Sequence, residues 1–128
     1  MQSLKDSVSV TGAAGAAVTA TLAAPANAGD YIFIGRLIVQ RFATALLTAG
    51  AAPLVVTTTN LQGARALSFP ADAALQGVVA TELLELARPL RATTPGIAVT
   101  IVCPATPNVI WRVTADYFSG PEWAGKLS

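Results

Sequence analysis

The chain has 128 residues, of which 53% are hydrophobic and only 12% are charged, and its formal net charge is +1. A chain of this length buries enough surface to fold without a metal or a disulfide, and we expect one domain over residues 1–128. Its lysines and arginines form no basic run, which argues against nucleic-acid binding. Because a surface with few charges keeps a monomer in solution poorly, the composition favours an oligomer or a larger assembly.

Residue types that commonly carry catalysis are scarce. The sequence has no histidine, which removes the commonest general base and the commonest metal ligand. The single cysteine, Cys103, lies in an apolar run and is expected to be a buried small hydrophobe. Glu82 and Glu85 are close in sequence but are interpreted as solvated surface residues. We therefore predict no enzyme activity, no catalytic residue, no cofactor and no metal site.

Two uncharged stretches, residues 7–29 and 42–64, are long enough to span a bilayer. Both are interrupted by Gly, Thr and Pro and neither is rich in leucine or isoleucine, so we predict no membrane span. Residues 26–28 resemble a signal-peptidase site, but the preceding segment lacks a charged start and an apolar core, and we do not interpret it as a signal peptide.

The first part of the chain contains short strand signals. Residues 1–6 are polar and are expected to form an N-terminal arm. Residues 7–10 are predicted as a short strand, and residues 18–22 alternate apolar residues with threonine, as in a half-buried strand. A cluster of turn-forming residues follows at 25–30.

Residues 30–42 (DYIFIGRLIVQRF) hold the densest run of β-branched and aromatic residues and are predicted as the central strand. Both sets of alternate positions are apolar: one carries Ile32, Ile34 and Ile38, and the other carries Tyr31, Phe33, Leu37 and Val39. A strand that is apolar on both faces is covered on both faces, and we expect another subunit to supply the second cover. Gly35 marks a bulge or a point of close approach within this strand.

Further strands are predicted at residues 44–48, 54–59, 65–69 and 75–81. Residues 81–87 fit a strand or a helical turn capped by Thr81, and the strand is preferred because the surrounding segments are strand-like. Residues 88–91 are interpreted as an extended linker, and residues 97–103 as a strand. With turn signals about every ten residues and no helical segments between them, eight to ten short strands indicate an all-β fold, an antiparallel sandwich or barrel.

Residues 109–118 show the clearest alternation. Val109, Trp111 and Val113 begin the set assigned to the core, and Arg112 and Asp116 belong to the exposed set, where they are expected to form an ion pair. The predicted core residues are Ile34, Val55, Val99, Ile101, Trp111 and Val113. Residues 119–128 are expected to be a C-terminal tail.

Aromatic residues and arginines are the usual anchors of protein interfaces. On that basis the predicted interface residues are Tyr31, Phe33, Arg36, Arg41, Phe118 and Trp123.

Three stretches carry a resemblance to a known family: VTATLAAPANAGDYIFIGRLIVQRFATALL at residues 18–47, LVVTTTNLQGARALSF at 54–69 and TIVCPATPNVIWRVTADYF at 100–118. In overall style and segment order the chain resembles head decoration (cement) proteins of tailed bacteriophages. The resemblance implies a jelly-roll-like β-sandwich with extended termini, located on the outer capsid of the virion, often as a trimer, and bridging neighbouring major capsid subunits. It implies no catalytic residues.

The sequence also leaves an alternative open. A carbohydrate- or receptor-binding sandwich of a phage tail or adaptor exposes aromatic side chains beside carboxylates or amides, and Trp123 with Glu122 fits that pattern.

Overall fold

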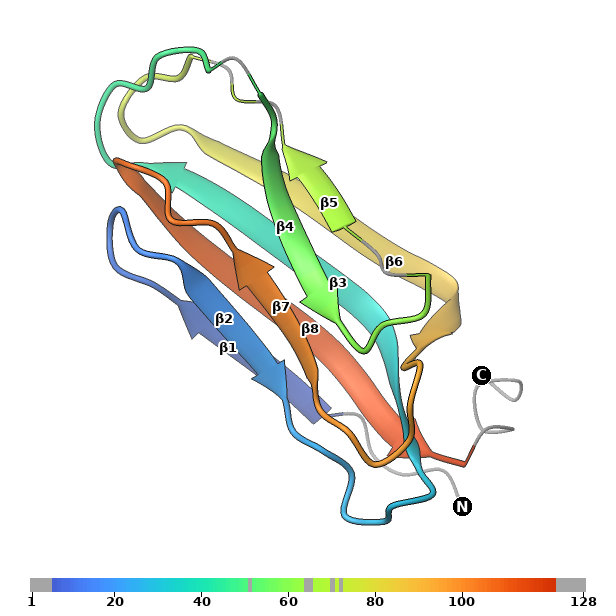
Figure 1. Ribbon diagram of the computed structural model, residues 1–128. Coiled ribbons are helices and arrows are strands. Elements are labelled where there is room, and N and C mark those ends of the chain that lie inside the picture. The colour runs from blue at the N-terminus through green and yellow to red at the C-terminus, as the bar shows by residue number, and fades with distance from the viewer. Residues whose placement is uncertain (1–5, 51, 64–65, 70, 72, 122–128) are drawn as a thin grey trace.

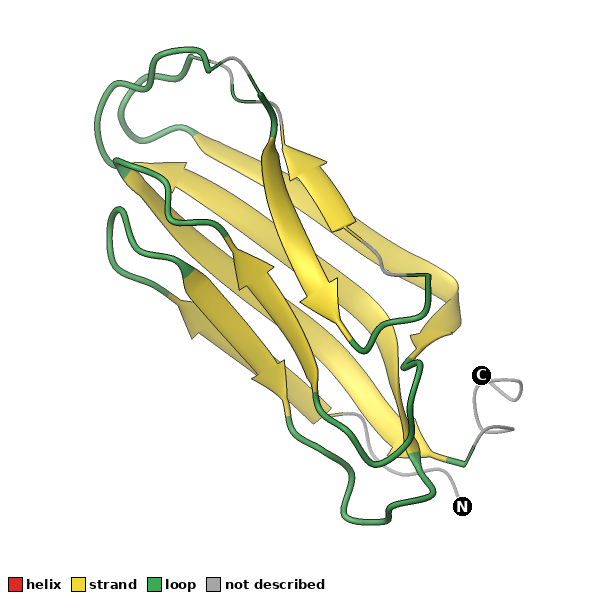
Figure 2. Cartoon of the chain, in the orientation of Figure 1, coloured by secondary structure: helices red, strands yellow, loops and turns green. Residues whose placement is uncertain are grey.

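The computed structural model describes residues 6–50, 52–63, 66–69, 71 and 73–121. These residues contain no helix and form eight strands: β1 (Asp6–Thr11), β2 (Val18–Leu22), β3 (Tyr31–Ala43), β4 (Leu54–Thr59), β5 (Ala66–Phe69), β6 (Val79–Arg91), β7 (Val99–Cys103) and β8 (Val109–Gly120). In Figure 2 the described residues are drawn only as strands and loops. Most of the predicted N-terminal arm and C-terminal tail lies outside the described residues.

The strands form two antiparallel four-stranded sheets that pack as a sandwich (Figure 1). Sheet A has the order β1-β8-β3-β6, and sheet B has the order β2-β7-β4-β5. The first strand therefore pairs with the last, β2 with β7, β3 with β6 and β4 with β5. A chain folded into one long hairpin and then rolled up gives this pairing, which is the eight-stranded jelly roll. The predicted all-β, jelly-roll-like sandwich is confirmed.

Turns with special backbone geometry meet at one end of the sandwich. Asn60 has a positive φ of 57°, which asparagine tolerates better than most residues. Its side chain accepts a hydrogen bond from the Thr94 amide at 2.8 Å and donates to the Ile97 carbonyl at 3.2 Å, which joins the β4–β5 turn to the β6–β7 loop. In that same loop, a Cβ on Gly96 would lie 2.8 Å from the Ala28 carbonyl oxygen, so the close approach requires glycine.

The core lies between the two sheets. Of the six predicted core residues, Ile34, Val99, Ile101, Trp111 and Val113 are buried. Trp111 fits the space through two directional contacts: its ring meets Phe69 edge-on with the centroids 5.3 Å apart, and its Nε1 donates to the Pro104 carbonyl at 2.9 Å. The prediction that Val55 belongs to the core is wrong, because Val55 is 39% exposed. In β4 it is Val56, one position later, that faces sheet A, and a strand turns successive side chains to opposite faces.

A bulge at Gly35 changes which side chains of β3 face the core. Ile34 is opposite Tyr117 and Arg36 is opposite Asp116, so Gly35 is the extra residue on β3. The predicted bulge is confirmed, but the predicted faces are wrong beyond it because the extra residue reverses the alternation. The inner side chains are Ile32, Ile34, Leu37, Val39 and Ala43, and the apolar outer ones are Tyr31, Phe33, Ile38 and Phe42.

Three predicted segments differ from the structure. Residues 44–48 form a loop, with an isolated bridge between Leu47 and Ala74 in place of a strand. Residues 75–78 are irregular, and β6 runs without interruption from Val79 to Arg91, so it includes both the ambiguous segment and the predicted linker. Pairing along β3 explains this continuity, because a 13-residue strand offers hydrogen-bonding partners to a neighbour of equal length.

We predict that Trp111→Ala lowers the free energy of unfolding by about 3–5 kcal/mol, because it removes a fully buried indole and leaves a cavity. Urea unfolding measures this loss. Val55→Ala is the matched control, and its exposed side chain predicts a loss below about 1 kcal/mol. A Trp111→Ala loss as small as that of the control would contradict the assigned register of β8.

Candidate functional site

The side of sheet A turned away from sheet B carries more apolar side chains than is usual for a solvated face. We call this surface the outer face. The register places on its two central strands, β3 and β8, the following described residues: Tyr31, Phe33, Arg36, Ile38, Gln40, Phe42, Ile110, Arg112, Thr114, Asp116 and Phe118. Outward residues of a sandwich are ordinarily polar, so this composition makes the outer face a candidate contact surface.

An aromatic cluster lies at one end of the outer face. Phe33 and Phe118 are opposite each other on β3 and β8, and their rings stack with centroids 5.1 Å apart and planes 14° apart. Tyr31 packs on this pair, and the Arg91 guanidinium lies over the Tyr31 ring, 4.7 Å from its centroid. The cluster is separate from the inter-sheet core.

Phe33 and Phe118 were predicted to be interface residues, but they are only 2% and 1% exposed. The two rings stack on each other and Tyr31 packs against them, and side chains this buried leave little surface for direct contact with a partner. Tyr31 is half-buried and remains at the surface of the cluster.

Next to the cluster, Arg36 and Asp116 form an exposed ion pair with an N–O distance of 3.6 Å. The predicted Arg112–Asp116 pair is wrong, because four residues of extended strand separate the two by about 13 Å. Instead, Arg112 Nε donates to Ser9 Oγ on β1 at 3.4 Å. Arg36, which was predicted to be an interface residue, lies on the outer face, and Arg112 is exposed two residues before Thr114 on β8.

The opposite end of the outer face is hollowed. A depression of about 290 Å³ is lined by Thr11, Gln40, Phe42, Val79, Ile110 and Arg112, which come from all four strands of sheet A. Phe42 and Val79 are exposed in it. Its walls are apolar with an arginine at the rim, which suits a side chain with an apolar body and an acidic or polar end.

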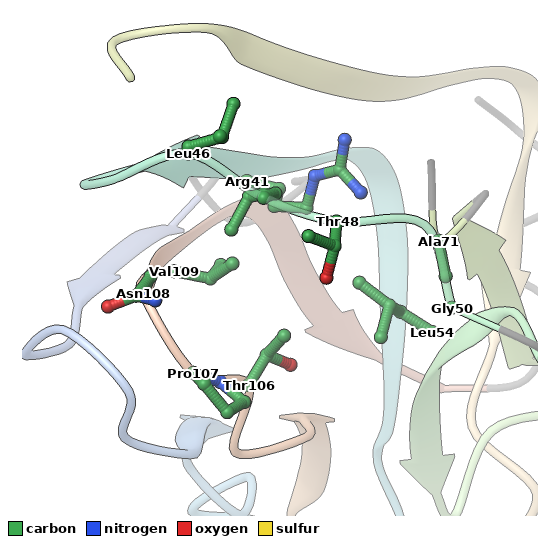
Figure 3. A pocket seen from close by; sticks show the side chains of 11 residues that line it. Arg41, Leu46, Thr48, Gly50, Leu54, Ala71, Thr106, Pro107, Asn108 and Val109 are labelled. Carbon is green, nitrogen blue, oxygen red and sulfur yellow. The ribbon is translucent and has the colours of Figure 1, made fainter. Parts of the chain in front are cut away.

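Arg41 was predicted to be an interface residue but points to the inner side of β3 and is 4% exposed. It shares that side with Leu37 and Val39, a consequence of the reversed alternation after Gly35. Arg41 lines a pocket of about 260 Å³ at the end of the sandwich, together with Leu46, Leu54 and Thr106 (Figure 3). In Figure 3 its guanidinium points away from Thr106 and Pro107 on the opposite wall, so the pocket meets mainly the apolar stem of this arginine.

Exposed apolar side chains gather at the same end of the molecule. We call this region the apolar tip: Phe42, Leu46, Leu75, Val78 and Val79, five of the seven large exposed hydrophobic residues in the described part of the chain. Backbone hydrogen bonds hold its two loops together, with Gly77 donating to the Ala43 carbonyl at 2.8 Å and Leu47 to the Ala74 carbonyl at 2.8 Å. The two loops lie at the upper left of Figure 1.

Sequence reasoning did not identify the apolar tip. Leu46 and Leu75 were assigned to strands, in which one side of each segment would be buried. Composition was the signal that could have indicated exposed loops here. Leucine and valine lie among Ala, Gly and Pro in segments where apolar and polar residues do not alternate.

The described residues contain no group of three acidic or cysteine side chains able to hold a metal, and no helix of sufficient length and apolar character to cross a membrane. Trp123 and Glu122, the pair considered for sugar binding, lie outside the described residues. Comparison with protein families, curated proteins and solved structures finds no match to this chain.

We predict that the Cys103 thiol is unreactive in the native protein. It is fully buried, and burial raises its pKa from 9.0 to about 12. At pH 8 the reactive thiolate is therefore about a thousandfold scarcer than in the unfolded chain. Ellman's reagent should label the urea-unfolded protein in seconds to minutes and the native protein only as it unfolds. Fast labelling under native conditions would place Cys103 at the surface.

The same pKa shift predicts how stability depends on pH. Below pH 9 the Cys103 thiol keeps its proton in both the native and the unfolded protein. Between pH 9 and about 12 only the unfolded chain loses this proton, which stabilises the unfolded state. The free energy of unfolding therefore falls as the pH rises. Comparing denaturant titrations of the wild type and of Cys103→Ala over this range isolates the contribution of the thiol, since the variant lacks it. If the free energies of unfolding of the wild type and of Cys103→Ala change with pH in parallel, the pKa of Cys103 is the same in the native and the unfolded protein.

Proposed function

We propose that this protein is a non-enzymatic virion structural protein, a capsid decoration (cement) protein on the outer surface of the particle. Its partner is the major capsid protein, and its role is to stabilise contacts between neighbouring capsid subunits. The observation that carries the proposal is the apolar tip, a surface on which large side chains are exposed to water at one end of a sandwich. Surfaces of this kind are typical of contact with another protein.

Two further features support the proposal. The jelly roll is common among viral capsid proteins, although it also occurs in lectins, so the fold is an analogy and not evidence of function. The low charge of the chain gives little electrostatic steering and much apolar area to bury. Affinity would then come mainly from the burial of apolar surface.

The mechanism that follows is thermodynamic. A protein that binds the assembled shell and not its free subunits raises the stability of the shell by mass action. Within the apolar tip, Leu75 is 70% exposed and Leu46 is 64% exposed, so both side chains are available for burial against a capsid subunit. Burial of each contributes up to about 1.5–3 kcal/mol, or roughly one to two powers of ten in affinity.

The test compares particles without the protein, with it restored, and with variants added. Particles lacking it should assemble but break at a lower temperature or under a milder osmotic shock, and the wild type should restore their resistance. Leu46→Asp and Leu75→Asp should each weaken binding to particles by about tenfold or more. Ile97→Asp is the matched control, because Ile97 is 51% exposed in the loop at the opposite end of the sandwich.

Two results would contradict the proposal. If the Leu75→Asp and Ile97→Asp variants bind particles equally well, the apolar tip is not the contact surface. If particles without the protein are equally robust but adsorb poorly to cells, a receptor-binding role replaces the cement role.

A further inference from the structure

We infer that the outer face of sheet A is a two-fold interface between two copies of this chain. This inference goes beyond the proposed capsid role and does not depend on it. It rests on the size of the outer face, on its apolar content and on the order of its charges along β8.

The outer face is large enough to form a stable interface. Strands β8, β3 and β6 have 12, 13 and 13 residues. At about 3.3 Å per residue and 4.8 Å between strands, these three strands and β1 cover on the order of 700 Å². That is close to the roughly 800 Å² that each partner contributes to a standard interface.

The centre of the outer face holds one apolar side chain between polar neighbours, at a position where a solvated strand is ordinarily polar. Ile38 lies in the middle of β3 with Thr114 opposite it on β8, and both are partly exposed. Sheet B covers the inner side of β3, whereas Ile38 on the outer side is partly exposed and does not belong to the inter-sheet core. A second copy laid against this side supplies the cover.

The order of charges along β8 is self-complementary. Consider a two-fold axis that lies in the interface, runs across the strands and passes through Ile38 and Thr114. Because Arg112 is two residues before Thr114 and Asp116 is two residues after it, the axis places Arg112 of each copy opposite Asp116 of the other. The same operation places Arg36 of each copy opposite Gln40 of the other. None of Arg36, Arg112 and Asp116 therefore lies opposite a residue of the same charge.

The two ends of the outer face also match under this axis. Phe42 and Ile110 are paired four positions from the centre on one side, and Phe33 and Phe118 are paired on the other. The axis therefore sets the hollow at Phe42 against the aromatic cluster and the Arg36–Asp116 pair of the second copy. Arg112, which lines the hollow, then lies opposite Asp116 of the second copy, and a cation opposite an anion is what an isologous contact requires.

This geometry leaves part of the apolar tip free. Phe42 and Val79 belong to both surfaces, whereas Leu46, Leu75 and Val78 lie in the loops beyond the strands. A dimer formed through the outer face therefore presents two apolar tips. The symmetry carried by this face is two-fold, in contrast to the three-fold symmetry that the family resemblance implies.

The test uses two charge-reversal variants, analysed singly and mixed, by sedimentation equilibrium of the full chain. The wild type should be a dimer at micromolar concentration. Arg112→Asp sets two carboxylates against each other across the interface, and Asp116→Arg sets two guanidinium groups against each other, so each variant should dimerise at least about tenfold more weakly. In a mixture of the two variants, the acidic positions of one copy face the basic positions of the other. The mixture should therefore form a heterodimer with most of the lost affinity restored.

Two controls separate folding from association. Thr19→Asp adds a charge to an exposed position of sheet B and should leave the dimer unchanged. Thermal unfolding of Asp116→Arg shows whether loss of the Arg36 pair affects the fold.

Several outcomes would overturn the inference. A wild type that is monomeric at about 100 µM excludes a stable dimer. If the mixture associates no more tightly than each variant alone, the chain self-associates through another surface. A trimer whose stability neither charge reversal changes would lead to the same conclusion. If the wild type is monomeric and both reversals abolish binding to particles, the occupant of the outer face is a capsid subunit. The Leu46→Asp and Leu75→Asp tests of the capsid role give their answer independently of all these results.

Discussion

The extra residue at Gly35 is the local feature on which the arrangement of both surfaces depends. Strand β3 lies between β8 and β6, so a reversal of its alternation changes the inner and the outer side of sheet A together. It turns Leu37 and Val39 into the core and sets Arg36 on the outer face beside Asp116. Without the bulge, Arg36 would follow Ile32 and Ile34 on the inner side, and a charge there would lack the water that solvates it.

The sequence predicts the fold correctly where apolar and polar residues alternate regularly along a strand. Strand β8 runs through its core-facing residues without a bulge, so the side assigned to Trp111 and Val113 was correct. In β3 the position of a bulge was predicted, but its effect on later residues was not carried through. Residues 44–48 have strand-like composition, yet without a partner strand on both sides they form a loop. Pairing partners are a tertiary property, and one segment does not specify them.

The candidate surfaces were only partly predictable for a related reason. Sequence reasoning chose Tyr31, Arg36, Phe33 and Phe118, all of which lie on the outer face. It did not anticipate that two of these aromatic rings stack and are buried, because the stacking depends on the register between β3 and β8. Leu46 and Leu75 were missed because exposure in a loop is decided by what the neighbouring loops cover.

The pairing of β8 with both β1 and β3 also has a consequence for synthesis of the chain. Among the strands of the described residues, β8 is made last, and β1, which pairs with it from Asp6 to Thr11, is made first. On the ribosome, β1 and the long apolar β3 therefore wait without their central neighbour while the intervening strands are translated. At roughly 5–20 residues per second the delay is several seconds, much longer than hydrophobic collapse. During that interval β3 lacks one of its two paired neighbours, and an unpaired edge on an apolar strand is prone to aggregation.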